Sequence, residues 1–241
     1  MLQQLGQTMQ TIDTANTHSA LGAADNLRFA LREVTAAAHD LLDNSMREAS
    51  GWTTREDYLR FLTLQYAARA PVEAWLSKHA PTALCPPAQS PLIADDLIKA
   101  GAAVPAIAGP FTLAGRPNHD RGADIADTAA AEALGAAWVL AGSSLGNRAI
   151  LKELRRAASD EGRDQWPASF LADPAMLQFW QTLRRRIERP ASKAEVRAAS
   201  RAALAVFDHF TEFVAPRSAE APDPTAAKSC NDLSTHSAAG A

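Results

Sequence analysis

A single histidine is the residue best placed to hold a metal in the first helical stretch of this sequence. His39 comes one turn after Thr35 and one turn before Asp43, slightly off the centre of an apolar stripe that includes Leu31 and Leu42. An imidazole there can face a partly apolar cavity while its other ring nitrogen meets a polar partner, as an axial iron ligand requires. The alternative is a boundary histidine with a local hydrogen bond, and position alone favours that alternative.

Two glycines stand four residues apart in the middle of a long helical pattern. Gly142 and Gly146 flank Ser143 and Ser144. Residues four apart share a helix face, and each glycine costs about 1 kcal/mol relative to alanine inside a helix. One explanation is close helix–helix packing through small residues. The other is a flat ligand that must approach the backbone more closely than a Cβ would allow, with glycines letting the helix bend over it.

Arginines could hold the acidic groups of such a ligand. Arg32 precedes His39 by two helical turns, and Arg184, Arg185 and Arg186 follow an aromatic pair on a separate helical stretch. The guanidinium fork pairs bidentately with carboxylates. Taken singly, each arginine is an ordinary solvated residue of a helix surface, so the argument depends on their combination.

Other site chemistries find no support. The CxxC, HExxH or Glu-x-x-His companions of zinc and di-iron sites are missing around His79, His119, His209 and His236. Cys85 lies in a Pro-rich stretch that is better explained as a connection. No GxSxG, P-loop or GxGxxG sequence opens a helix, so hydrolase, nucleotidase and dinucleotide-binding functions are not indicated.

The elements that must position these residues are helices. The 241 residues are rich in alanine, leucine, arginine and glutamate, and only 6% are aromatic. Periodicity and capping residues predict helices over about 27–50, 54–76, 94–100, 124–158, 176–188 and 193–214, with Asp25 as the first N-cap. We expect Pro71 to kink or split the second helix, and residues 142–144 to interrupt the long one. Residues 23–215 are expected to form one helical domain, between a flexible segment at 1–22 and a disordered tail at 216–241.

The bulk properties exclude several classes of partner. The formal net charge is −3 at pH 7, so no global basic field indicates nucleic acid or an anionic membrane. The two cysteines cannot form a disulfide framework, which favours a reducing compartment. The first residues lack a signal-peptide pattern, and no apolar run is long enough to span a bilayer. We therefore expect a cytoplasmic protein that binds neither nucleic acid nor membrane.

Three stretches together resemble the haem oxygenase family, particularly its bacterial biliverdin-producing branch. They are LREVTAAAH at 31–39, WVLAGSSLG at 138–146 and FWQTLR at 179–184, and the similarity in order and spacing runs from about residue 26 to 214. The resemblance implies an all-α fold, a single haem oxygenase-like multi-helical domain with haem between a proximal and a distal helix.

The resemblance also assigns roles to residues of this chain. It implies that His39 is the proximal iron ligand and that Arg32, Thr35, Ser144 and Arg184 contact the haem, the two arginines at its propionates. Catalysis would fall to the distal helix. The catalytic residues implied there are Gly142, Ser143 and Gly146. The two glycines would let the helix backbone press on bound oxygen. Ser143, together with Ser144 or a water molecule, would donate hydrogen bonds to it.

The implied reaction is oxidative cleavage of haem, which is both substrate and cofactor. Its products are biliverdin, ferrous iron and carbon monoxide, and a ferredoxin or reductase must supply electrons because the chain has no flavin or nicotinamide motif. A biliverdin-binding photoreceptor is a possible recipient of the product.

Three positions depart from the family pattern. Ser143 stands where many relatives have aspartate, Ala141 where bacterial members often have glutamate, and Asn147 where glycine is common. These differences suggest an alternative, a haem carrier or sensor of the same fold that does not degrade haem. A helical enzyme acting on a thiamin- or quinone-like ligand is a second alternative, and an interaction scaffold a third.

Overall fold

Helices account for the regular structure of this chain. The computed structural model describes residues 26–113, 125–161 and 166–214. Within these ranges it has no strand, and its one β-bridge joins Asn26 to Pro190. The helices are α2 (Leu27–Ala49), α3 (Arg55–His79), the 3-10 turn η1 (Thr82–Leu84), α4 (Ser90–Lys99), α5 (Ile125–Glu161), α6 (Ser169–Ala172), α7 (Pro174–Ile187) and α8 (Lys193–Val214). The predicted all-α fold is confirmed; the predicted end segments, 1–22 and 216–241, lie outside the described residues.

Local signals in the sequence set most helix ends. Thr54 and Asp57 form a reciprocal capping box at the start of α3, and the Ser192 hydroxyl accepts from the Glu195 backbone N–H at the start of α8. Gly51 follows α2 with a φ of 66°, a left-handed conformation that glycine adopts without strain. The first cap differs from the prediction: Asn26, and not Asp25, caps α2 by accepting from the backbone N–H of Arg28.

Neither of the two predicted interruptions splits its helix. Pro71 lies inside α3, which runs unbroken for 25 residues. Its missing backbone hydrogen bond is offset by burial, because Ala68, Ala70 and Val72 on either side are all in the core. The glycine–serine stretch at 142–144 also lies within one continuous helix, the 37-residue α5.

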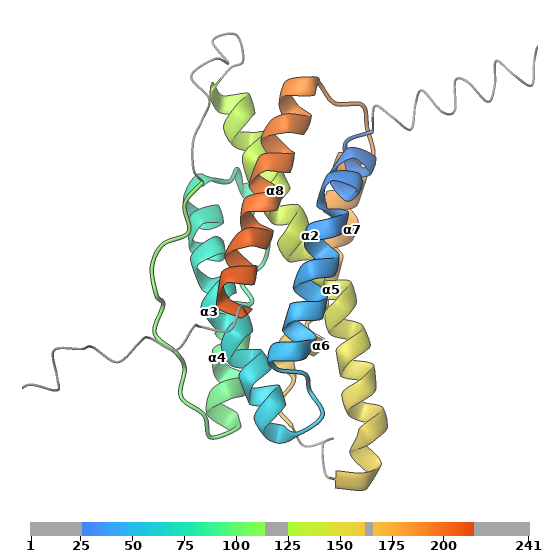
Figure 1. The fold of residues 1–241 in the computed structure, drawn as a ribbon. Coiled ribbons are helices and arrows are strands. Elements are labelled where there is room, and N and C mark those ends of the chain that lie inside the picture. The colour runs from blue at the N-terminus through green and yellow to red at the C-terminus, as the bar shows by residue number, and fades with distance from the viewer. Residues whose placement is uncertain (1–25, 114–124, 162–165, 215–241) are drawn as a thin grey trace, which may run out of the picture.

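The long helix α5 spans the bundle, and α8 packs along it (Figure 1). At Gly135 the two backbones are so close that an added Cβ would lie 2.0 Å from the Ala199 carbonyl oxygen. Only glycine permits this contact, which therefore fixes the register of α5 on α8. α8 also packs along α2, so α8 contacts both of the helices that carry His39 and the glycine pair.

The apolar core has two clusters. One gathers the start of α2, the second half of α3, the first half of α5, and α7 and α8. The other joins the first half of α3 to α4, α6 and the later part of α5. Leu42 of α2 packs against both clusters. The boundary between them therefore falls near the middle of α2, which is also where His39 lies.

Candidate functional site

His39 lies on the surface of α2 with two carboxylates near one of its ring nitrogens. Its side chain is 57% exposed, and its Nδ1 is 3.6 Å from an Asp43 carboxylate oxygen and 3.8 Å from one of Asp40. The ring meets the edge of buried Phe207 on α8, with 6.1 Å between centroids. No partner is recorded for Nε2 among the described residues. Both carboxylates lie on the Nδ1 side of the ring at distances longer than a hydrogen bond, which leaves Nε2 as the ring atom available to a ligand or metal.

Of the two predicted carboxylate-binding arginines, Arg184 contacts an acidic residue and Arg32 contacts none within the part of the chain that the structure describes. Glu188 accepts from Arg184 Nε at 2.9 Å and from Arg28 Nη1 at 2.9 Å, which ties the end of α7 to the first turn of α2. Arg32 is exposed one turn after Arg28 and has no recorded partner among the described residues. Glu188 therefore brings the guanidinium groups of Arg28 and Arg184 together, and Arg28 is a residue that sequence reasoning missed. Its signal was the four-residue spacing to Arg32.

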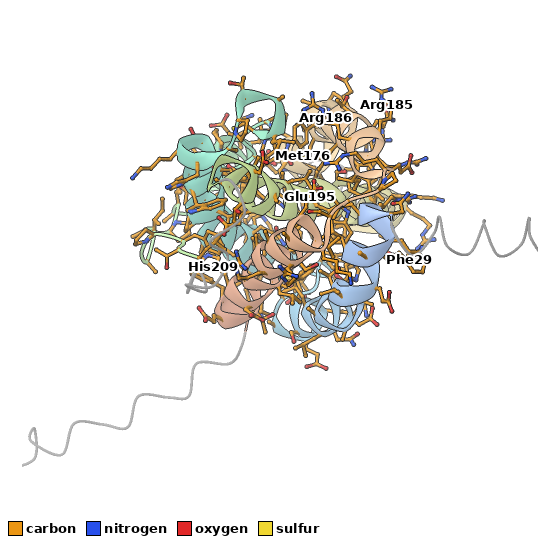
Figure 2. All side chains as sticks on the ribbon, turned by 90° about the horizontal axis from the view of Figure 1, so that it is seen from above. Phe29, Met176, Arg185, Arg186, Glu195 and His209 are labelled. Carbon is orange, nitrogen blue, oxygen red and sulfur yellow. The ribbon has the colours of Figure 1, made fainter. Side chains whose placement is uncertain are left out.

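The other two arginines of α7 take no part in this cluster. Seen from above, Arg185 and Arg186 point outward from the bundle (Figure 2). Both are exposed, as expected for an ordinary solvated helix face. Of the three consecutive arginines, the structure therefore brings only Arg184 to α2.

The glycine pair of α5 has no explanation in the packing of the described residues. A Cβ at Gly142 would make an ordinary 3.8 Å contact with the Trp180 ring, and a Cβ at Gly146 would meet nothing within 4 Å. Gly135, two turns earlier, shows what a packing glycine looks like, because a Cβ there would enter the α8 backbone. Small-residue helix packing therefore accounts for Gly135 and not for the predicted pair.

The hydroxyl groups beside the glycines are turned into the protein. Ser143 Oγ donates to the Leu140 carbonyl at 2.7 Å, and Ser144 Oγ donates to the Ala141 carbonyl at 2.7 Å. A hydroxyl has one proton to donate, so each is committed to its own helix. On α2, Thr35 is likewise buried and donates to the Leu31 carbonyl at 2.8 Å.

Sequence reasoning missed a buried cation behind Ser143. Arg69 of α3 is 0% exposed, and its Nη2 donates to Ser143 Oγ at 2.8 Å. Its Cζ lies 5.4 Å from the centre of the Phe170 ring of α6. Burial lowers the pKa of this guanidinium from its ordinary value, and the charge of Glu73 opposes that effect. The available signal was a lone charged residue inside an apolar run, AARAPV at 67–72.

The helices that carry His39 and the glycine pair are joined through their neighbours. Both α7 and α8 pack against α2 and against α5, whereas direct packing between α2 and α5 is minor at most in the described part of the chain. Large apolar side chains are exposed beside both predicted positions: Leu41 on α2 at 56% and Leu145 on α5 at 52%. An apolar surface on each helix therefore faces away from the core.

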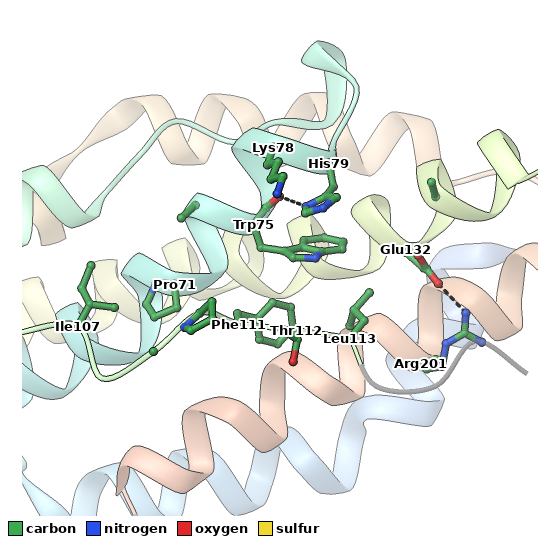
Figure 3. Close-up of a pocket in the computed structure, with 14 residues that line it drawn as sticks. Pro71, Trp75, Lys78, His79, Ile107, Phe111, Thr112, Leu113, Glu132 and Arg201 are labelled. Atoms are coloured by element: carbon green, nitrogen blue, oxygen red, sulfur yellow. Dashed lines mark hydrogen bonds and ion pairs between the residues drawn. The ribbon is translucent and has the colours of Figure 1, made fainter.

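A hollow elsewhere on the molecule has a different lining. It measures about 780 Å³ and lies between α3, α5, α8 and the segment around Phe111 (Figure 3). Trp75 and Phe111 form its aromatic wall, and Arg201 bonds Glu132 at its rim. None of the predicted site residues lines it, so it is separate from the site at His39.

Comparison with known protein families shows to which family this chain belongs. The family model described as haem oxygenase matches residues 25–216, about four fifths of the chain. The chain belongs to the haem oxygenase family. A search of curated proteins finds no significant match. In the described residues of this haem oxygenase family member, no helix is both long and apolar enough to cross a membrane.

The residues present fit haem as a ligand of this family member. The imidazole Nε2 of His39 suits iron, and the guanidinium groups of Arg32 and Arg184 suit propionates. A Cβ added at Gly146 would meet nothing within 4 Å, so the backbone there is open to a ligand on that side. One turn before Gly142, the indole nitrogen of Trp138 is buried with no acceptor among the described residues, as is found beside ligand sites. No cluster of three or more metal-ligating side chains occurs in the described ranges.

Proposed function

We propose that this protein binds haem between α2 and α5 and cleaves it oxidatively to biliverdin, ferrous iron and carbon monoxide. The observation that carries the proposal is the contrast among three glycines of one helix. Gly135 is required by packing against α8, whereas Gly142 and Gly146 have no packing reason and cost about 1 kcal/mol each. A flat ligand lying against the α5 backbone supplies the missing reason.

In this proposal His39 holds the iron through Nε2, and Asp43 fixes the ring by its contact with Nδ1. Arg32 and Arg184 bind the propionates, and Arg184 exchanges its contact with Glu188 for a ligand carboxylate. The ring of Trp180, which faces Gly142, bounds the proposed haem site on the side of α7. Bound haem supplies the iron that activates dioxygen and the porphyrin carbon that is oxidised.

The chain's own residues also shape the oxygen side. Gly142 and Gly146 would let the helix backbone approach the ring, which would narrow the space on that face of the ligand. Since Ser143 and Ser144 donate to helix carbonyls, their oxygens act as acceptors, and ordered water must donate to any ligand. We expect electrons from a ferredoxin or reductase, and a biliverdin-binding photoreceptor as a recipient of the product.

One observation favours a second candidate, a haem carrier or sensor. Neither serine next to the first glycine offers a free hydroxyl proton toward the ligand side. A site without a positioned donor can hold haem yet fail to activate oxygen.

Turnover distinguishes the two candidates. The protein is reconstituted with hemin, and reductant, oxygen and catalase are added while the spectrum is followed. A haem oxygenase replaces the Soret band with biliverdin absorption, whereas a carrier keeps the Soret band. A chain that forms no stoichiometric hemin complex, or whose His39→Ala variant keeps the wild-type spectrum, contradicts both candidates.

A further inference from the structure

The buried cation on α3 is poorly compensated by the residues around it. Among the described residues, Arg69 makes a single hydrogen bond, to Ser143, and its Nε and Nη1 are buried without an acceptor. The nearest acidic residue of its own helix is committed elsewhere, because the Glu73 carboxylate accepts from the backbone of Gln89 and from the backbone and hydroxyl of Ser90. Burying a charge on these terms is costly, so its position needs a reason.

The single contact of Arg69 is with the residue that follows the first glycine of the predicted pair. The Ser143 oxygen accepts from Arg69, and its proton goes to Leu140, so this hydroxyl cannot act as the donor of the distal helix. The unused N–H groups of a fully buried guanidinium remain as donors, and buried donors of this kind are satisfied by ordered water or by a ligand. The charge-assisted donors next to Gly142 are therefore those of Arg69.

We propose that Arg69 is the positioning residue of the oxygen side, which acts through Ser143 and ordered water to place a fixed positive charge behind the glycine face of α5. This inference rests on the proposed haem site between α2 and α5. It assigns to α3 and α6 a part in the reaction, because the guanidinium of Arg69 lies over the Phe170 ring of α6. A purely structural brace between α3, α5 and α6 is the competing explanation.

The charge can be read spectroscopically, independently of turnover. A positive charge beside the oxygen side draws electron density from iron into carbon monoxide and lowers the C–O stretching frequency of the ferrous carbon monoxide complex. We expect Arg69→Met to raise this frequency and Arg69→Lys to return it toward wild type. Arg60→Gln removes an exposed arginine of the same helix and leaves the frequency unchanged.

The second variant removes the acceptor instead of the charge. Ser143→Ala should move the frequency in the same direction as Arg69→Met, and the double variant should move it no further than the larger single shift. In the haem-free protein, urea unfolding of the four chains of this cycle should show favourable coupling between Arg69 and Ser143. That measurement does not depend on haem.

The outcomes separate this inference from the proposed function. If wild-type protein binds no hemin, the proposed function fails and this inference fails with it. If hemin binds normally but the frequency of Arg69→Met equals that of wild type, Arg69 is only a brace and this inference alone is overturned. Should Arg69→Met not fold, an unchanged frequency in Ser143→Ala overturns it equally, because that variant removes the only hydrogen-bond acceptor of Arg69 among the described residues.

Discussion

Replacing Gly146 by alanine should stabilise the haem-free protein and weaken its binding of haem. A Cβ at this position meets nothing within 4 Å, and the residue lies inside a continuous α-helix. The gain is the difference in helix propensity, about 1 kcal/mol, which corresponds to an increase in Tm of roughly 2–4 °C for a domain of this size. If haem lies against this backbone, the added methyl group lowers hemin affinity by about tenfold or more.

The matched control is Gly135→Ala in the same helix. There the Cβ would lie 2.0 Å from the Ala199 carbonyl, so the haem-free protein should lose stability, by about 1–3 kcal/mol from overpacking. The assays are urea unfolding of both haem-free variants and titration with hemin followed at the Soret band. The reasoning is refuted if Gly146→Ala destabilises the haem-free chain, or if it binds hemin as tightly as wild type.

Three further predictions follow from the site and its surroundings. His39→Ala should lose the ligated Soret spectrum while changing the urea midpoint of the haem-free protein little, because the side chain is 57% exposed; a large loss of stability would show a structural role. Glu188→Gln should tighten hemin binding a few-fold by releasing Arg184, whereas Arg184→Gln should weaken it, and equal effects of the two variants in a hemin titration would contradict the assigned roles. Burial lowers the pKa of His209 below its ordinary 6.5, and the hydrogen bond to the Ala68 carbonyl opposes this effect. As the pH falls below about 6.5, the unfolded chain therefore takes up a proton at this residue before the folded chain does. The free energy of unfolding should fall over that pH range, and it should fall less in His209→Gln.

The sequence predicted the helices well because their signals are local. Capping residues such as Thr54 and Ser192 act within one turn, so their neighbours in sequence suffice. Pro71 misled the prediction, because burial on both sides of the proline, which depends on distant helices, outweighs the local cost. The periodic pattern alone could not show that outcome.

The candidate site was only partly visible in the sequence. Its glycine pair and His39 stand out by spacing, but the function of a glycine depends on what faces it. Gly135 meets a residue 64 positions away, and Arg69 meets one 74 positions away. Nothing in the neighbouring sequence indicates either of these distant contacts. Only the folded chain therefore distinguishes a glycine required by helix packing from a glycine that leaves room for a ligand.

The long helix α5 changes its surroundings half-way along. Every residue from 131 to 137 is enclosed by other helices, whereas residues 145, 146, 148 and 149 are open to solvent. Amide hydrogens of the first half should therefore exchange only when the whole molecule unfolds, and those of the second half through smaller local openings. Local opening of the second half of α5 would then admit a ligand beside it, while the enclosed first half keeps the helix bundle assembled.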